Sequence, residues 1–453
     1  MSCTSNITSG FIDLATYDEL EKYFYGGSNA TAYFVRETRK ATWFTQVPVV
    51  LSRCTGSADF GQDFSVAISR AGDYLLGCWL RVTLPSVTLA SPTNKSLRWT
   101  RNFMHNLISE CSITFNDLHA QHFDNYHLDF WSAFTVPAGK SNGYKNMIGD
   151  FDDLIGGGQQ SIPSFTLNLP LPFFFTRDSG LGLPTAALPY NEMRINFCLR
   201  NWTDLLIIDE ASTKTSRVAT SSDLTSTPSL TAVQVWANYA IVSNDERKRM
   251  ACAPRNMLVE QTQSAPVSTW DPTRPGSIDL RFAHAIKVLF FAVQNTTLAS
   301  QWSNYTTASP VPSNGSDNPV NLTPSLTSDP ILHTSLTYEN TARLQQMGSD
   351  YFSLIQPWYH APVIPAETGY HMYSYSLDFI SVDPKGSTNY GKLTNVSILP
   401  YPSELAVRCA AGGEVVTNVD TGAELPQKYK FVCTAVNNNV IRVSGGALGF
   451  PVL

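Results

Sequence analysis

Hydrophobic and polar residues alternate with a period of two along residues 64–80. Successive side chains of a β-strand point to opposite faces of a sheet, so this alternation predicts two half-buried strands. The hydrophobic positions of the two strands are Phe64, Val66, Ile68, Tyr74, Leu76, Cys78 and Leu80. In each strand we expect these positions to face a hydrophobic core.

The same pattern returns later in the chain without a gap, with Ile278 in the place of Phe64, 214 positions earlier. The repeated hydrophobic positions are Ile278, Leu280, Phe282, Val288, Phe290 and Ala292. Because the repeat lies about half the chain length away, we expect the chain to contain the same domain twice.

Other predicted strands follow in the same order in both halves. Ser112–Asn116 of the first half matches Ser335–Glu339 of the second in character, and a cluster of aromatic residues follows each. Further strands are predicted at 43–51, 165–175, 190–199, 233–241, 258–263, 371–379, 393–399 and 429–435. Polar segments at 133–164, 205–230 and 295–330 are predicted to form long loops.

Helical periodicity is scarce over the 453 residues, and two β-sandwiches of about 200–250 residues would account for nearly the whole length. The sequence therefore predicts an all-β protein of two tandem eight-stranded jelly-roll β-sandwiches, a double jelly roll, with a short N-terminal helical arm. The charged run Asp245–Arg249 marks the boundary between the sandwiches. The predicted division is an N-terminal arm at 1–45, a first jelly roll at 46–245, a linker at 246–257 and a second jelly roll at 258–453.

The predicted arm contains one short amphipathic helix. Thr16–Glu19 has the form of a capping box, and Leu20, Tyr23 and Phe24 share one helical face. Gly26 is suited to end the helix. Two interpretations stay open: the helix packs as an ordinary element, or it docks onto a neighbouring molecule or a membrane surface.

Composition narrows the classes of partner. Charged residues make up 15% of the chain, against roughly 25% in an average soluble protein, and aromatic residues make up 11%. A surface poor in charge suggests that much of it contacts other protein. The 31 basic and 37 acidic residues give a net charge of −6, which argues against direct binding to nucleic acid.

The eight cysteines are scattered, with no Cys-x-x-Cys pair and no Cys/His pairing at metal-binding spacing. Several lie on predicted strands, where a free thiol acts as a small hydrophobic group, so we expect a reducing compartment. The N-terminus lacks the features of a signal peptide, and no run of about 18 apolar residues predicts a membrane span. The cysteines are Cys3, Cys54, Cys78, Cys111, Cys198, Cys252, Cys409 and Cys433.

Motifs that resemble catalytic or metal-binding sites do not fit their full patterns. Gly139–Ser141 resembles the end of a phosphate-binding loop, but Phe134 stands where the pattern requires Gly. Three aspartates at 150, 152 and 153 lack the spacing of a calcium loop. A near cluster consists of His119, His122 and His127 with Asp117, Asp124 and Asp129.

Residues three apart on a strand point to opposite faces, so His119 and His122 are not expected to converge on a metal. The sequence therefore predicts no catalytic residue, no cofactor-binding residue, no metal-binding residue and no cofactor, and the protein is not expected to be an enzyme. A catalytic pair of carboxylates that meet only in three dimensions stays open.

Strings distributed over the whole chain resemble one protein family. They are Gly10–Asp18, Phe60–Val66, Gly72–Tyr74, Met104–Asn106, Leu188–Glu192, Ser303–Thr306, Gly386–Gly391 and Gly449–Leu453. Together they are similar to the major capsid proteins of iridoviruses, within the nucleocytoplasmic large DNA viruses. The loop at 409–424 departs from the family, because it lacks the longer glycine and asparagine run of relatives.

The resemblance implies a double jelly roll that assembles into homotrimers. Two sandwiches per chain give a trimer six similar wedges, so it would form a pseudo-hexagonal capsomer. The resemblance also implies that the arm lies on the inner side of the capsomer, facing the internal viral membrane or minor capsid proteins. The long loops would then decorate the outer face.

On this basis we expect a structural major capsid protein that self-assembles into the icosahedral shell of a large double-stranded DNA virus. Its expected location is the virion, after assembly in the host cytoplasm. The expected partners are further copies of the chain, within and between capsomers, together with minor capsid proteins and the internal membrane; direct binding to nucleic acid is not expected.

Two alternatives from other classes stay open. A carbohydrate-binding β-sandwich is suggested by Trp270, Trp302 and Tyr305, which lie near predicted loops and look exposed. A jelly-roll hydrolase would need a convergent carboxylate pair in one cleft. The absence of G-x-S-x-G and H-E-x-x-H motifs and the repeat in both halves weigh against it.

Overall fold

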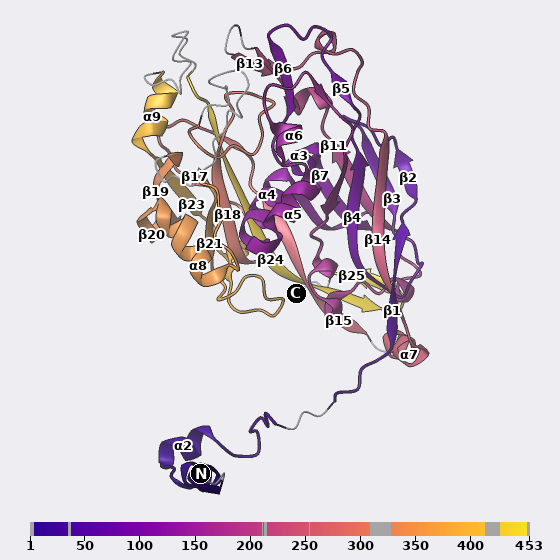
Figure 1. Ribbon diagram of the computed structural model, residues 1–453, viewed down its shortest axis with the longest axis vertical. Helices are drawn as coiled ribbons and strands as arrows, with labels where there is room; N and C mark the ends of the chain where they lie inside the picture. The colour runs from indigo at the N-terminus through magenta and orange to yellow at the C-terminus, as the bar shows by residue number, and fades with distance from the viewer. Residues whose placement is uncertain are drawn as a thin grey trace. The chain divides into compact units, whose positions relative to one another are not determined.

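The computed structural model describes residues 4–34, 38–210, 212, 215–252, 254–308, 328–412 and 426–450. The chain forms two compact units, residues 1–43 and 44–453. The first unit contains helices α1 (Thr4–Ala15) and α2 (Glu19–Phe24). The second unit contains the β-sheets (Figure 1).

Helix α2 begins at a capping box, but not at the predicted one. Asp18 is the N-cap, and its carboxylate accepts hydrogen bonds from the backbone N–H groups of Leu20 and Glu21. The Glu21 side chain in turn accepts from Asp18 N at 2.9 Å. The box is therefore formed by Asp18 and Glu21 rather than by Thr16 and Glu19, because the helix begins after Asp18. No residue of α2 is buried.

The first jelly roll packs two antiparallel sheets against each other. The sheet that we call the β4 sheet has the order β1 (Phe44–Val50), β14 (Ala232–Val242), β4 (Tyr74–Thr83), β10 (Thr166–Pro170). The facing sheet has the order β2 (Arg53–Gly56), β3 (Asp63–Ala67), β11 (Met193–Leu199), β7 (Ile108–Phe115), β8 (Leu118–Asp124).

The second jelly roll repeats this plan. The β18 sheet has the order β15 (Arg255–Ser264), β24 (Tyr429–Ser444), β18 (Ala285–Asn295), β21 (His371–Ser374), and the facing sheet has the order β17 (Ile278–Asp279), β23 (Val396–Pro402), β19 (Ile331–Tyr338), β20 (Thr341–Gly348). Three short strands extend the β18 sheet: β16 (Ser268–Trp270), β22 (Thr388–Asn389) and β25 (Ala447–Gly449).

Smaller elements complete the second unit. The remaining strands are β5 (Val87–Thr88), β6 (Lys95–Trp99), β9 (Ser161–Ile162), β12 (Leu206–Glu210) and β13 (Thr215–Val218). The α-helices are α3 (Phe103–Leu107), α4 (Asn125–Thr135), α5 (Ala138–Ile148), α6 (Asp152–Ile155), α7 (Asn244–Cys252), α8 (Gln356–His360) and α9 (Glu404–Ala411), and a π-helix η7 (Tyr351–Ile355) runs into α8. Short 3₁₀ turns are η1 (Phe174–Thr176), η2 (Ser179–Leu181), η3 (Thr185–Ala187), η4 (Trp202–Asp204), η5 (Ser221–Asp223) and η8 (Tyr390–Lys392).

The two rolls have the same strand order. Numbered one to eight along each roll, the strands form one sheet in the order 1-8-3-6 and a facing sheet in the order 2-7-4-5, with β2 as an extra edge strand in the first roll. Eight antiparallel strands in two such sheets define a jelly roll. The predicted double jelly roll and the repeat of one domain are therefore confirmed.

The register of the repeat differs from the predicted offset of 214. A β-bulge leaves Leu76 unpaired in β4, and a bulge leaves Lys287 unpaired at the same point of β18, so these strands correspond at an offset of 211. On the facing sheets, Val66 of β3 pairs with Ile195 of β11, and Ile278 of β17 pairs with Ile398 of β23. Val66 and Ile278 therefore correspond, which gives an offset of 212 for these strands.

The bulge also changes which residues face the core. Alternation predicts that Tyr74 and Leu76 point the same way as Cys78, but Leu75 is the fully buried residue and Tyr74 and Leu76 are half-buried. One extra residue reverses the phase of a strand, so the pattern on either side of Leu76 cannot be read as one face.

Two predicted loops contain regular structure. Residues 133–164 hold the end of α4, helices α5 and α6 and strand β9, and residues 205–230 hold β12 and β13. The loop at 409–424, which differs from the family pattern, begins inside α9, and residues 413–424 lie outside the described residues. Among the described helices, none has the length and apolar character needed to cross a membrane.

Candidate functional site at the junction of the two jelly rolls

Helix α4 of the first roll covers the outer face of the β18 sheet (Figure 1). The carboxylate of Asp124 caps the helix by accepting from His127 N at 2.8 Å. Tyr126, Phe130 and Phe134 are spaced four residues apart, so they share one face of the helix. All three are buried, and the helix joins the two rolls through them.

Phe290 on β18 is the centre of this contact. Its ring lies 5.3 Å from the ring of Phe134 and 6.1 Å from that of Phe130, and both pairs are stacked. Val288 and Ala292 flank it on the same face of the strand, and all are buried. Since each aromatic side chain buries a large apolar area, this cluster is a major source of the cohesion between the rolls.

A buried carboxylate fixes the polar half of the junction. Asp129 Oδ1 accepts from Asn102 Nδ2 at 3.1 Å and from His105 Nδ1 at 2.7 Å, both in the first roll. Its Oδ2 accepts from Ser303 Oγ at 2.7 Å and from Tyr305 OH at 2.8 Å, both in the second roll. Four donors saturate one carboxylate, so the charge is buried without an unmet lone pair.

Burial and the nearby Asp129 carboxylate raise the pKa of the Tyr305 phenol, so the hydroxyl stays protonated and donates. Ser303 has a positive φ of 57°, which turns the loop into the first roll. The segment 295–330 is predicted to be a loop on the outer face. That prediction is wrong for the first part of the segment, because Tyr305 lies inside the junction and is 1% exposed. Residues 309–327 lie outside the described residues.

The aromatic residues that suggested a carbohydrate site do not form one. Trp270 is buried in the core of the second roll, and Tyr305 is buried in the junction. Trp302 is half-buried; its indole N–H donates to the Asp204 carbonyl at 2.9 Å, and the Arg200 guanidinium lies 4.1 Å from its ring. Two of the three rings are buried and the third is half-buried under Arg200, so the prediction that these aromatic residues are exposed is wrong.

An ion triad crosses the junction near the bulge in β18. Arg177 of the first roll and Lys287 of the second both pair with Glu260 on β15, and the Arg177–Glu260 distance is 2.5 Å. All three side chains are at most 12% exposed. Arg177 also donates to the Ile380 carbonyl at 2.8 Å and lies over the Trp131 ring at 4.4 Å. These pairs stand in low dielectric and fix the orientation of the rolls.

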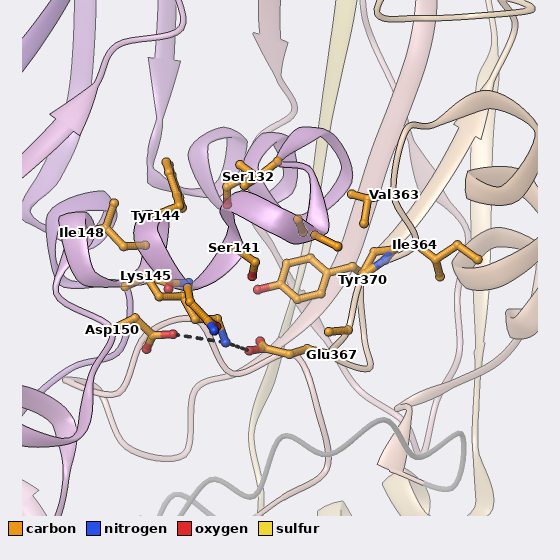
Figure 2. Close-up of a pocket in the computed structure, with 17 residues that line it drawn as sticks. Ser132, Ser141, Tyr144, Lys145, Ile148, Asp150, Val363, Ile364, Glu367 and Tyr370 are labelled. Atoms are coloured by element: carbon orange, nitrogen blue, oxygen red, sulfur yellow. Dashed lines mark hydrogen bonds and ion pairs between the residues drawn. The ribbon is translucent and has the colours of Figure 1, made fainter.

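A pocket of about 360 Å³ opens at the rim of the junction, between α5 and the segment 363–370 (Figure 2). Lys145 lies between Asp150 and Glu367, at 3.8 Å and 3.4 Å. Arg101 pairs with the same two carboxylates, at 3.3 Å and 2.8 Å. Each carboxylate is therefore engaged by two cations, an arrangement that bridges the rolls and leaves neither acid placed as a free proton donor.

The near cluster of histidines and aspartates is dispersed. His119 and His122 are exposed on β8, where a bulge adds Ala120 and disturbs the alternation. His127 is a buried residue of α4, Asp124 caps that helix and Asp129 binds the four donors. Within the described residues, no group of three or more His, Cys, Asp or Glu side chains is placed to hold a metal ion.

One cluster in the second roll combines a hydroxyl, an imidazole and a carboxylate. Ser349 Oγ and Asp329 Oδ2 lie 2.8 Å and 2.9 Å from the same atom, His371 Nε2, and Ser349 also donates to Asp329. A catalytic triad needs the carboxylate on one ring nitrogen and the hydroxyl on the other, in an open cleft. His371 and its two partners are buried here, so the cluster is a structural contact.

Fold and junction define a class: an all-β double jelly roll whose halves are joined into one body by a buried, saturated interface. Two family models match the chain. The model described as major capsid protein N-terminus matches residues 32–242, and the model described as large eukaryotic DNA virus major capsid protein matches residues 246–449.

Curated relatives match along the full length. The chain is 60% identical to the major capsid protein of Invertebrate iridescent virus 6 over 469 aligned residues, which cover 99% of each chain. It is 50% identical to that of Lymphocystis disease virus 1 (isolate Darai) and 46% identical to that of Frog virus 3 (isolate Goorha), again over 99% of each chain. The chain belongs to the family of major capsid proteins of the iridoviruses and other large eukaryotic DNA viruses.

Solved structures agree on the fold. PBCV-1 VP54 superposes with a TM-score of 0.74 at 21% identity, over 93% of this chain and all of the other. The Faustovirus major capsid protein superposes with a TM-score of 0.68 at 11% identity, over 95% of each chain. By its family, this chain has a structural role in the capsid shell and is a component of the virion.

Proposed function

We propose that three copies of the chain form a pseudo-hexagonal capsomer and that capsomers tile an icosahedral shell. The identical strand order of the two rolls carries this proposal. Three chains with two equivalent rolls each supply six similar units around a closed ring. Repeated modest contacts between such tiles then give the shell high avidity.

Light scattering on the purified full-length chain, with negative-stain images of the same peak, tests the trimer. We expect a mass of three chains and hexagonal outlines. A stable single chain at all concentrations up to those of shell assembly would contradict the proposal. Salt titration of assembled shells adds a second reading: contacts between trimers should weaken before the trimer dissociates, if they are the more polar.

We also propose the division into an arm at 1–45, a first roll at 46–245, a linker at 246–257 and a second roll at 258–453. The charged helix α7 (Asn244–Cys252) joins the last strand of the first roll to the first strand of the second, which supports a linker there. Its side chains are not buried. Limited proteolysis should therefore cut first in the arm and next near α7.

The proposed role needs no catalysis, metal or cofactor. The carboxylates of the rim pocket are paired with cations, and the hydroxyl–imidazole–carboxylate cluster is closed to substrate. A carboxylate-dependent hydrolase rate that is lost in Glu367→Gln would contradict this proposal. The proposed partners are other copies of the chain, without direct binding of nucleic acid.

The arm is proposed to contact the internal viral membrane or minor capsid proteins. Its apolar side chains are exposed in the first unit, among them Phe11 and Leu14 on α1 and Tyr23 on α2. Binding of the full-length protein to anionic vesicles, reduced by Phe11→Ser, would support membrane contact; unchanged binding would contradict it.

Assembly is proposed to occur in the host cytoplasm. Among the described residues, the cysteines at 54, 78, 111, 198, 252 and 433 are free thiols. Burial raises the pKa of Cys111, so this thiol stays protonated and inert. Shells recovered from cytoplasmic fractions of producing cells would support the site of assembly, and shells confined to another fraction would contradict it.

A further inference from the structure

The segment formed by η7 and α8 presents an apolar surface. We call it the α8 patch; it consists of Leu354, Ile355, Trp358 and Tyr359, which are 40%, 43%, 72% and 72% exposed. Two large aromatic side chains left exposed on one turn of helix mark a protein contact surface.

The internal repeat identifies the partner of this patch. The β7–β8 pairing includes Glu110 with Asp124, and the β19–β20 pairing includes His333 with Gly348 at the corresponding place. Gly348 therefore takes the place of Asp124, immediately before the helical segment. Counted from there, Phe352 corresponds to Leu128, and both are buried in the core of their own roll, which supports the alignment.

The same count places the α8 patch on the helix face that joins the rolls. Leu354 corresponds to Phe130, and Trp358 corresponds to Phe134. In the first roll, Phe130 and Phe134 cover the outer face of the β18 sheet around Phe290. The equivalent side chains of the second roll are exposed. The α8 patch thus has the position in the second roll that the sheet-covering face of α4 has in the first roll, but no sheet in the described part of the chain covers it.

The matching sheet face is open on the first roll. Aligned at the bulges Leu76 and Lys287, Trp79 on β4 takes the place of Phe290. Trp79 is half-buried and stacks on Trp236 of β14 at 6.0 Å. A groove of about 780 Å³ runs over this face, with Gly77, Trp79, Pro170 and Asn238 on one wall and residues of α4 and α5 on the other.

A neighbouring strand repeats the contrast. Strand β15 lies beside β8 of the first roll, and Gln261 Nε2 donates to the Ala120 carbonyl at 2.7 Å. Its equivalent in the first roll is β1, which exposes Phe44, Val47 and Val50. The equivalent of β8 is β20, whose residues are exposed or half-buried. Strands β15 and β8 contact each other inside the chain, whereas their equivalents β1 and β20 are both left uncovered.

Charge distinguishes the internal docking site from the open one. Register places Gln46 of β1 where β15 has Glu260, and Leu76 where β18 has Lys287. The open face thus lacks the carboxylate that binds Arg177. The outer face of the β4 sheet therefore matches the α8 patch, which is apolar and carries no cation. The outer face of the β18 sheet matches α4, because Arg177 next to α4 pairs with Glu260.

We propose that the α8 patch of one copy docks on the outer face of the β4 sheet of a second copy, with Trp358 against Trp79, and so repeats the internal contact between the rolls. This inference rests on the proposed trimer and names its contact. The contact is heterologous, so it generates a ring when the rotation closes. Three such contacts close a ring of six rolls.

Two substitutions in the full-length chain test the contact from its two sides. Trp358→Glu removes the exposed anchor, and Gly77→Arg adds bulk to the receiving face. A Cβ at Gly77 meets nothing within 4 Å, so the second variant is compatible with the fold. Leu332→Glu, at a 52% exposed position on the facing sheet, is the matched control. Light scattering should give single chains for both variants and trimers for the control, with unchanged circular dichroism.

A photoreactive benzophenone amino acid in place of Trp358 identifies the contact directly. In a mixture of isotope-labelled and unlabelled chains, we expect cross-links between copies, to peptides from β4, β10 or β14. Cross-links to the arm (residues 1–43), or between two copies of position 358, would overturn the docking. A trimeric Trp358→Glu variant would overturn it while leaving the trimer intact. A single-chain mass for the unsubstituted protein would instead reject the trimer itself, and the docking with it.

Discussion

The outer faces of the β4 and β18 sheets occupy the same place in two copies of one fold, yet only one is covered within the chain. On the β18 sheet, α4, the 296–308 loop and the ion triad exclude solvent, and every residue from Ile286 to Asn295 is buried. On the β4 sheet, Trp79 and Trp236 stay half-exposed beside a groove. The difference shows how a duplicated domain divides one contact into an internal junction and an assembly surface.

Removal of the buried carboxylate should have the largest effect on the covered face. Asp129→Ala leaves four buried donors without an acceptor, and we expect the free energy of unfolding to fall by about 3–5 kcal/mol. Asp129→Asn keeps one acceptor oxygen and should cost less. Urea denaturation followed by tryptophan fluorescence measures both. Equal, small losses would show that the polar half of the junction contributes little.

The aromatic hubs of the two faces can be compared directly. Phe290→Ala removes the centre of a closed cluster and should lower the free energy of unfolding by about 3–5 kcal/mol. Trp79→Ala, at the equivalent open position, should lower that of the single chain by only about 1 kcal/mol, because the ring is already half-exposed. The comparison requires dilutions at which the mass is that of one chain. A larger effect at Trp79 than at Phe290 would reverse our interpretation.

The ion triad predicts an asymmetry between its members. Glu260→Gln leaves Arg177 and Lys287 close together without a carboxylate, and should cost about 3 kcal/mol. Lys287→Leu introduces the residue that the first roll has at Leu76, and Glu260 keeps its pair with Arg177. We therefore expect a loss below about 1 kcal/mol. Thermal unfolding at low and high salt measures both, and equal losses would contradict the triad as described.

The last expected effect appears only in acid, below about pH 6.5. Burial, together with the positive charge of Arg177 and with His122, lowers the pKa of His127 from 6.5 to about 3. The unfolded chain takes up this proton below about pH 6.5 and the folded chain does not. The free energy of unfolding should therefore fall by about 1.4 kcal/mol per pH unit, through this residue alone, as pH drops from about 6.5 toward 3.

His127→Gln should make this pH dependence shallower by about one proton between pH 6 and pH 4. His119→Gln, at an exposed position on β8, is the control and should leave the slope unchanged. Urea unfolding at three pH values in this range gives the slopes. An unchanged slope in His127→Gln would mean that the histidine is charged, or hydrated, in the folded protein.

The sequence predicts the fold further than it predicts the junction. Alternation is a local signal, and it is enough to reveal two sandwiches and their repeat. Bulges interrupt that signal without a mark in composition, which is why the offset at Leu76 and Lys287 is missed. Helix α5 has the residues Gly139, Ser141 and Gly143, which are typical of loops, and tertiary packing overrides their propensity.

The junction depends on contacts between distant positions. Arg177 meets Glu260 across 83 residues and Tyr305 meets Asp129 across 176. No periodicity encodes such pairs, and Tyr305 has the same local surroundings as an exposed loop aromatic. The sequence signals at this place are the strings Met104–Asn106 and Ser303–Thr306, whose resemblance to the family indicates importance but not position.

The separation of 176 residues between Asp129 and Tyr305 affects how the chain folds while it is being synthesised. The last strand of the first roll ends at Val242, so at about 5–20 residues per second the roll is complete on the nascent chain for roughly 3–13 s before its last two hydrogen-bond donors, Ser303 and Tyr305, are synthesised. During that interval α4 displays Phe130 and Phe134 to the crowded cytosol, and a neighbouring nascent chain presents the same rings. Translation speed across the first β-strands of the second roll therefore sets how long each new chain is open to misassembly.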